Sequence, residues 1–248
     1  MVTARIRRPD GRIQFDASAL TFQMVGKGSV NVQGRVAGNT TPGSALIPIP
    51  SASATRVLAV AAPFFTAKAG TTQINGQTYA HYACSVASGT VSYWMFDLSS
   101  NMPRSPGGLT LRNPQTGVII YSSDYDVFRV VDRLTSAGDS RNLDASRTYA
   151  VAQQDFAGHR RPLSPGSYFL NGQEIIWDGS PQGRDSSWSY QNDGKLYGTR
   201  VSGGAISSGE VSWDDVRGQL GFGPTPPDYP PDWTRPLGNA LIVDVTGL

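Results

Sequence analysis

The sequence predicts an all-β protein with an antiparallel, sandwich-like architecture and little helix. Both residues of an Asn-Gly or Asp-Gly turn adopt positive φ, so these dipeptides between β-prone runs are the strongest local hairpin signal. The chain carries four such turn signals: Asp10-Gly11, Asn75-Gly76, Asn171-Gly172 and Asp193-Gly194.

The composition favours the same fold class. Among 248 residues, Gly occurs 28 times and Pro 17 times, and neither suits the interior of a helix. Strong helix formers are scarce, with Glu only at positions 174 and 210 and Lys only at 27, 68 and 195, although a GC-rich coding sequence would also deplete Lys. Aromatic residues make up 10% of the chain, enough to build a core.

Further strands are expected where apolar residues alternate or cluster, at residues 29–36, 57–61, 90–96, 148–153 and 240–245. Residues 213–220 could instead form a short helix, capped by Ser212. The Gly/Ser-rich residues 202–209 are compatible with either a loop or a bulged strand.

A repeated segment is the most informative feature of the sequence. Residues 5–26 align with residues 110–132 after one insertion, with six identities in about twenty positions: Arg7/Arg112, Pro9/Pro114, Gly11/Gly117, Ile13/Ile119, Phe22/Phe128 and Val25/Val131. Each copy reads as a strand, a Pro-x-Gly turn, a second strand and a third strand with Phe and Val. We therefore expect a three-stranded meander used twice, in two halves of one sandwich or at the starts of two domains.

The repeat also carries a family resemblance. Its turn is followed by an alternating strand that ends in Phe15-Asp16 or Tyr121-Ser122, and an aromatic strand, residues 93–97, precedes the second copy. Over residues 1–135 this pattern resembles small β-rich virion proteins from the tail modules of tailed bacteriophages. The resemblance implies a component of the tail tip, baseplate or tail-fibre attachment, present in several copies per virion, and it implies no catalytic residues.

Three regions are expected along the chain. Residues 1–135 would form a β domain with the repeated hairpin, and residues 136–222 a second β-rich region, either separate or continuous with the first. Residues 223–248 read as a Pro-rich extended arm that ends in a strand. That strand could pair with its own sheet or a neighbour's, and the candidate assembly residues on the arm are Tyr229, Trp233, Leu241, Ile242 and Val243.

Charge and motifs exclude several functions. A net charge of +2 is too small for a nucleic-acid or membrane-surface footprint. The opening residues lack the apolar core of a secretory signal, so we expect synthesis in the host cytoplasm and residence in the virion tail. Nucleophile-elbow, dinucleotide, P-loop and EF-hand motifs do not occur, and the two His residues, His81 and His159, are far apart in sequence. We expect no enzyme activity, no cofactor and no metal, with Cys84 as a small buried hydrophobe.

Aromatic residues concentrate in the second half of the chain, where they could form either core or a recognition surface. The segment around Asp193-Gly194 is the expected exposed tip, with Trp188, Tyr190, Asp193 and Tyr197 as the candidate interaction surface. The leading hypothesis is a structural virion protein that binds other tail proteins in a symmetric assembly and possibly a host-surface glycan or protein. A carbohydrate- or receptor-binding β-sandwich is the alternative, and a hydrolase with a site hidden from sequence is a third.

Overall fold

The computed structural model confirms the all-β fold. It describes residues 5–7, 13–16, 21–34, 41–50, 55–102, 108–113, 115–153, 156–162, 167–170, 173–176, 187–213, 217–222, 233–238 and 240–248. Within these residues the chain forms strands and one short 3₁₀ helix, and it contains no helix long and apolar enough to cross a membrane.

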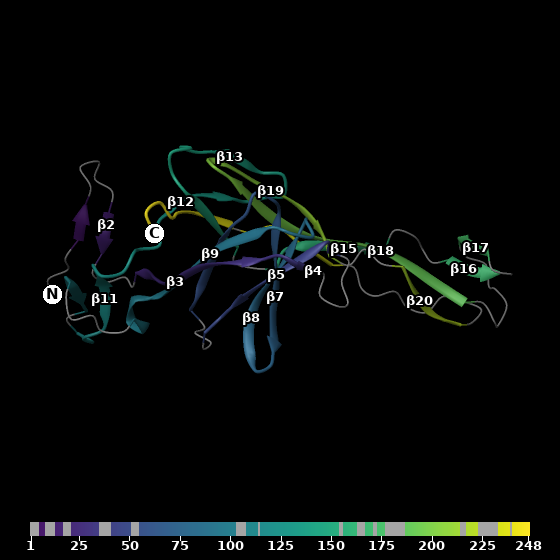
Figure 1. Cartoon of the computed structure of the whole chain (residues 1–248), viewed down its shortest axis with the longest axis horizontal. Helices are drawn as coiled ribbons and strands as arrows, with labels where there is room; N and C mark the ends of the chain where they lie inside the picture. Colours follow the sequence, from purple (N-terminus) through teal and green to yellow (C-terminus); the bar gives the residue numbers. More distant parts are fainter. Residues whose placement is uncertain are drawn as a thin grey trace.

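The strands follow one another closely (Figure 1). They are β1 (Arg5–Arg7), β2 (Ile13–Asp16), β3 (Phe22–Asn31), β4 (Gln33–Gly34), β5 (Gly43–Pro48), β6 (Val57–Ala61), β7 (Thr66–Ile74), β8 (Gln77–Cys84), β9 (Thr90–Leu98), β10 (Thr110–Arg112), β11 (Ile119–Ser122), β12 (Val130–Leu134), β13 (Ser140–Asn142), β14 (Tyr149–Gln153), β15 (Gly158–Pro162), β16 (Ser167–Leu170), β17 (Gln173–Ile176), β18 (Ser187–Ser202), β19 (Ala205–Ser212), β20 (Arg217–Phe222), β21 (Trp233–Arg235) and β22 (Ala240–Asp244), with the 3₁₀ helix η1 (Ser99–Asn101) after β9.

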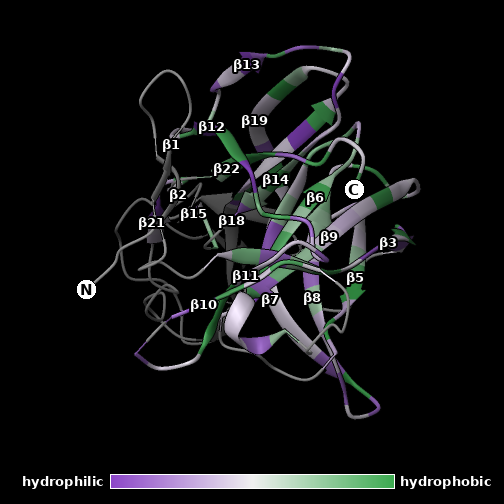
Figure 2. Cartoon of the chain, turned by 90° about the vertical axis from the view of Figure 1, so that its left-hand side faces the viewer, coloured by the Kyte–Doolittle hydropathy of each residue, from purple (hydrophilic) through white to green (hydrophobic). Residues whose placement is uncertain are grey.

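Two large antiparallel sheets form the body of the molecule. The first has the strand order β12-β22-β14-β6-β9-β3, and the second contains the path β13-β19-β18-β7-β8-β5-β4. Their facing sides enclose two core clusters. One contains Ile47, Tyr82 and Val91, and the other contains Leu134, Ile206 and Ile242. The central strands of the first sheet are accordingly rich in hydrophobic residues (Figure 2).

The strand order shows that the duplication extends through the whole chain. In the first half β3 and β6 flank β9, and in the second half β12 and β14 flank β22. The second sheet repeats this relation, because β5 and β7 flank β8 while β13 and β18 flank β19. Equivalent strands occur in the same order along the chain, and both sheets read as palindromes about their centres. The two copies are therefore halves of one body, related by a pseudo-twofold axis.

Contacts between equivalent residues mark this axis. In the first sheet β6 joins β14 through the pair Val60 and Val151. In the second sheet β7 joins β18 through Thr66 and Thr199, both buried. An added Cβ at Gly198 would lie 2.8 Å from the Thr66 carbonyl oxygen, so a glycine beside Thr199 lets the two backbones approach.

A third contact at the axis joins the two copies of the sequence repeat. The backbone N–H of Phe128 donates to the carbonyl of Phe22 at 2.9 Å, and the two rings lie 6.2 Å apart. The adjacent Gln23 and Val127 form an isolated antiparallel bridge. The two edge segments of the first sheet therefore meet, and the sheet curls around a core shared by both halves that includes Phe96 and Val243.

The predicted meander is confirmed in both copies. In β1–β2, Ile6 pairs with Phe15 and Arg7 with Ile13, with a register shift between Ile6 and Arg7. The hairpin β10–β11 has the matching pairs Leu111↔Tyr121 and Arg112↔Ile119, with its register shift at the matching step. The third strands also shift at matching positions, at Val25 opposite β9 and at Val131 opposite β22.

Three of the four turn predictions agree with the strand pairing and one is wrong. Asn75 and Gly76 have φ values of 50° and 79° and join β7 to β8 as expected. Asp193-Gly194 forms no turn, because β18 runs straight through it and pairs there with β15. Gly194 is buried, so this glycine marks a close approach of backbones rather than a reversal.

The short helix predicted at residues 213–220 is also wrong, because Arg217–Phe222 forms β20, which pairs with β18. Tertiary pairing overrides a local capping pattern here. Residues 202–209, which could have been a loop, form the end of β18, a turn and the start of β19.

The three expected regions share their sheets. The first sheet combines β3, β6, β9 and β12 from residues 1–135 with β14 and β22. The last strand pairs with β12 and β14 of its own chain, which resolves the alternative that the sequence left open. The Pro-rich residues 223–232 lie outside the described residues.

We predict that β22 is essential for stability. Ile242 is completely buried between the two sheets, so Ile242→Ala should lower the free energy of unfolding by about 2–5 kcal/mol, measured by urea denaturation. Val130, on the neighbouring strand but 47% exposed, provides the control: Val130→Ala should cost well under about 1 kcal/mol. Equal losses in the two variants would contradict this role of β22.

Candidate functional site

The second hairpin, β10–β11, is anchored on the body by hydrogen bonds to its backbone. The Thr21 hydroxyl donates to the Ile120 carbonyl at 2.6 Å, and the Ser99 hydroxyl donates to the Ile119 carbonyl at 3.0 Å. The Gln23 amide donates to the Ser122 carbonyl at 2.6 Å. Ile120 is thereby 2% exposed, so this hairpin forms part of the packed structure.

The first hairpin, β1–β2, has the same register but different chemistry on the corresponding face. Its Gln14 and Asp16 stand where the second hairpin buries Ile120 and Ser122. A Gln and an Asp seldom occupy fully buried positions. The residues on the opposite face, by contrast, are similar in both hairpins: Ile13 and Phe15 correspond to Ile119 and Tyr121. The first hairpin is thus suited to a more solvated position, and β1 and β2 pair only with each other.

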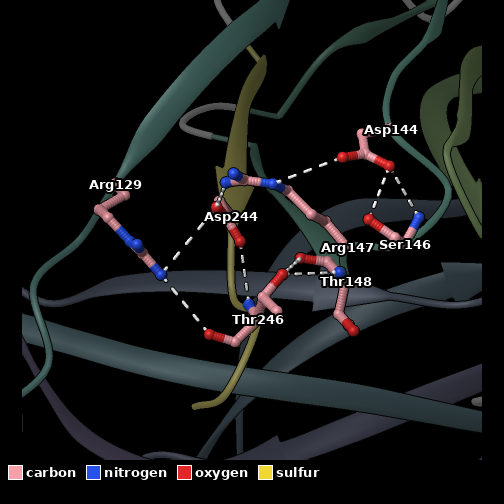
Figure 3. Close-up of polar contacts among 7 residues, drawn as sticks. All are labelled: Arg129, Asp144, Ser146, Arg147, Thr148, Asp244 and Thr246. Carbon is pink, nitrogen blue, oxygen red and sulfur yellow. Dashed lines mark hydrogen bonds and ion pairs between the residues drawn. The ribbon is translucent and has the colours of Figure 1, made fainter.

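A polar network closes the end of the second half (Figure 3). The carboxylate of Asp244, at the end of β22, is 2% exposed. It accepts a hydrogen bond from the Arg147 guanidinium at 2.7 Å, and Arg129 lies 4.0 Å away. The backbone N–H of Thr246 donates to Asp244 at 3.0 Å. Arg147 also pairs with Asp144 at 3.8 Å, so this network links three loops and strands.

The first half contains an equivalent network. Asp97, at the matching position of β9, is 1% exposed. It accepts hydrogen bonds from Thr55 at 2.5 Å and Asn101 at 2.9 Å, and it pairs with Arg56 at 3.4 Å. A buried carboxylate needs such partners because an unpaired buried charge is very costly. The duplication of the network argues for a structural role of both carboxylates.

Opposing effects act on the pKa of Asp244. Burial by itself raises this pKa, but hydrogen bonds from Thr246 and Arg147 and the charge of Arg129 outweigh it, so the pKa lies below its ordinary value. The carboxylate therefore stays ionised at neutral pH and holds both arginines.

The groups that could supply nucleophilic chemistry are enclosed. The Ser44 hydroxyl lies 3.0 Å from His81 Nε2, but the two residues are 0% and 7% exposed. Burial lowers the pKa of His81, whose ring lies 5.5 Å from that of Trp213. Cys84 is fully buried in a core cluster, as expected, and burial raises the pKa of its thiol to about 12. Within the described ranges, His, Cys, Asp and Glu form no group of three or more that could hold a metal ion.

The expected exposed tip around Asp193-Gly194 is wrong because β18 is continuous there. Trp188, Tyr190 and Asp193 lie along this strand, and only their backbone is described. The Tyr197 side chain is half-buried, packs against a core cluster and places its hydroxyl 3.2 Å from His159 Nδ1. Tyr197 is therefore a core residue, separated from the other three by the body end of β18.

The expected assembly arm is likewise built into the body where it is described. Ile242 and Val243 are fully buried, and Leu241 is half-buried against the core shared by both halves. Trp233 lies on β21 with its ring 5.1 Å from that of Phe156. Tyr229 lies outside the described residues. Strand β22 lies between β12 and β14, so its backbone groups are already paired within the chain.

The sequence does contain a signal for the wider duplication. Residues 55–61, TRVLAVA, match residues 146–152, SRTYAVA, at four positions, and residues 95–99, MFDLS, resemble residues 242–246, IVDVT. These segments hold the two Arg–Asp networks. The spacing between them differs because the second half carries extra strands, which hides the match from an alignment without long gaps.

No family model, curated protein or solved structure matches the chain.

We predict that Cys84 is unreactive in the folded protein. A buried thiol with a raised pKa presents almost no thiolate at pH 8. Iodoacetamide should therefore label Cys84 slowly in buffer and rapidly in 6 M guanidinium chloride, as followed by mass spectrometry. Equal labelling rates in the two conditions would contradict the buried position.

We also predict a pH-dependent contribution from Asp244. Its pKa is lower in the folded than in the unfolded chain, so its stabilising effect is complete above the unfolded value of about 3.9 and is lost as the pH falls through the folded value. Asp244→Asn should cost about 1.5–3 kcal/mol at pH 7, and the difference from the wild type should shrink below about pH 4.

The control for this prediction is Asp132→Asn, which breaks an ion pair between Asp132 and Arg141 that is about one-third exposed on both sides. Pairs of this kind contribute about 0–1 kcal/mol. A cost for Asp244→Asn that stays constant from pH 7 to pH 2 would show that the ionised carboxylate is not the stabilising group.

Proposed function

We propose that this chain is a structural virion protein of a tailed bacteriophage, placed at the tail tip, the baseplate or the attachment point of a tail fibre, and that it acts by protein–protein assembly. The proposal starts from the sequence resemblance over residues 1–135. The structural observation that supports it best is the duplicated body that carries an additional two-stranded hairpin, β1–β2, outside both main sheets.

The first hairpin is the element best suited to contact another subunit. It repeats the register of β10–β11 yet carries Gln14 and Asp16 where the other hairpin is buried. Both hairpins lie at the same end of the molecule (Figure 1). A two-stranded hairpin alone is marginally stable in water, so β1–β2 gains most from a partner surface that covers its Ile13 and Phe15 side.

The structure changes which segment should be deleted to test assembly. Removal of residues 223–248 would delete β22 from the middle of the first sheet and unfold the body. A chain that starts at Thr21 loses only β1 and β2, which pair with no other strand, and should keep its fold.

We expect the full chain to form an oligomer of defined mass in multi-angle light scattering, and the chain that starts at Thr21 to be a monomer with an unchanged circular dichroism spectrum. The substitution Phe15→Ser should weaken the oligomer, while Ile74→Ser, at the exposed tip of β7–β8, should not. Persistence of the oligomer without residues 1–20 would rule out the hairpin as the assembly element.

Location in the virion is tested separately. Antibodies against the chain should label one end of the tail in electron micrographs of phage particles from a producing culture. Labelling of capsids, or none on any purified particle, would rule out the tail assignment whatever the mass measurements give.

A further inference from the structure

The two halves differ by one large addition, and the addition forms a sheet of its own. Strands β16, β17 and β20 have no counterpart in the first half, where β6 leads directly to the hairpin β7–β8. They pair around the first part of β18, whose last part, from Lys195 to Ser202, pairs with β19 in the body. Sixteen residues of strand span about 50 Å, so β18 carries this outer sheet away from the body (Figure 1).

The strand register places aromatic residues together on one face of the outer sheet. Ile175, Tyr168, Trp188 and Gly221 occupy one row across β17, β16, β18 and β20. Tyr190, two residues after Trp188 and opposite Gly218, belongs to the same face. The three aromatic positions are separated by one strand spacing, about 4.8 Å, and one two-residue step, about 6.6 Å, which is the scale of a sugar ring.

Two glycines flank this aromatic group on β20. Gly221 lies opposite Trp188, and Gly218 lies opposite Tyr190. Glycine inside a strand weakens the strand and commonly marks a place where a ligand or another backbone approaches closely. Two glycines in register with two aromatic residues therefore indicate a shallow position beside the rings rather than a filled core.

From these placements we propose that the face of the outer sheet with Tyr168, Trp188 and Tyr190 binds a neutral oligosaccharide. Sugar rings present C–H groups that stack on aromatic faces, while their hydroxyls bond to uncharged polar groups. The paired positions of this face carry Gln173 and no Asp, Glu, Lys or Arg. This inference goes beyond the proposed assembly role and does not depend on it.

The size and charge of the face separate a glycan from other partners. Four strands spaced about 4.8 Å apart and about 13 Å long present about 250 Å², far below the roughly 800 Å² that each partner buries in a standard protein interface. Single-stranded nucleic acid also stacks on aromatic residues, but it requires a cationic groove, and no Lys or Arg occupies a paired position of this face. A short uncharged oligosaccharide satisfies both limits.

The test uses the full-length chain on a glycan array of neutral hexose and N-acetylhexosamine oligomers, followed by calorimetric titration of the tightest binder. Trp188→Ala should weaken binding at least tenfold, whereas Trp188→Phe should keep it within about threefold. Gly221→Val leaves every aromatic residue in place and suits a strand, but its side chain should obstruct the sugar and also weaken binding at least tenfold.

The matched control is Gly34→Val on β4, where an added Cβ meets no atom within 4 Å, and its affinity should equal that of the wild type. Binding of no neutral glycan would overturn the proposal, as would equal affinities of Trp188→Ala, Gly221→Val and wild type. If Trp188→Ala disrupts the outer sheet, Gly221→Val and Trp188→Phe still decide the outcome. Oligomer mass and tail labelling report on assembly independently of these titrations.

Discussion

The structure depends on the joining of two half-sheets at the pseudo-twofold axis. Each half alone would end in an open strand, β6 in one sheet and β7 in the other, with unpaired backbone groups that attract other chains. Pairing of β6 with β14 and of β7 with β18 covers all four edges at once. The join needs small or branched residues that allow close approach, and Val60, Val151, Thr66, Thr199 and Gly198 supply them. Both core clusters and both Arg–Asp networks lie on either side of this join.

The features that could be predicted from sequence are those encoded by neighbouring residues. The Asn75-Gly76 turn, strand β6 and the register of both repeated hairpins follow from local turn chemistry and period-two patterns. Features set by distant residues could not be read in this way. Asp193-Gly194 has the composition of a turn, but pairing with β15 on one side keeps it extended. The residues of β22 look like an arm after a Pro-rich spacer, yet the second half lacks a sheet centre without them.

Comparison of the two halves separates scaffold from addition. Elements present twice, such as the Asp97 and Asp244 networks, perform the same structural task in each half. Elements present once are free of that task, and they include the outer sheet around β18 with its aromatic row. An addition here leaves the body unchanged, because β18 reaches the axis with its last residues while its first residues carry the extra strands. This arrangement allows recognition to vary without altering the core.

The order of strands along the chain also constrains folding. The first half has all its body strands once β9 ends at Leu98, and its pairings are between strands fairly close in sequence. The second half requires β22, which begins only nine residues before the C-terminus and pairs with β12 more than a hundred residues earlier. Contacts of such long range are slow to form because closing a long loop costs entropy before any contact offsets it. The first half therefore offers β6 and β7 as templates on which β14 and β18 can assemble, and insertion of β22, with Asp244 engaging Arg147, is the step that completes the molecule.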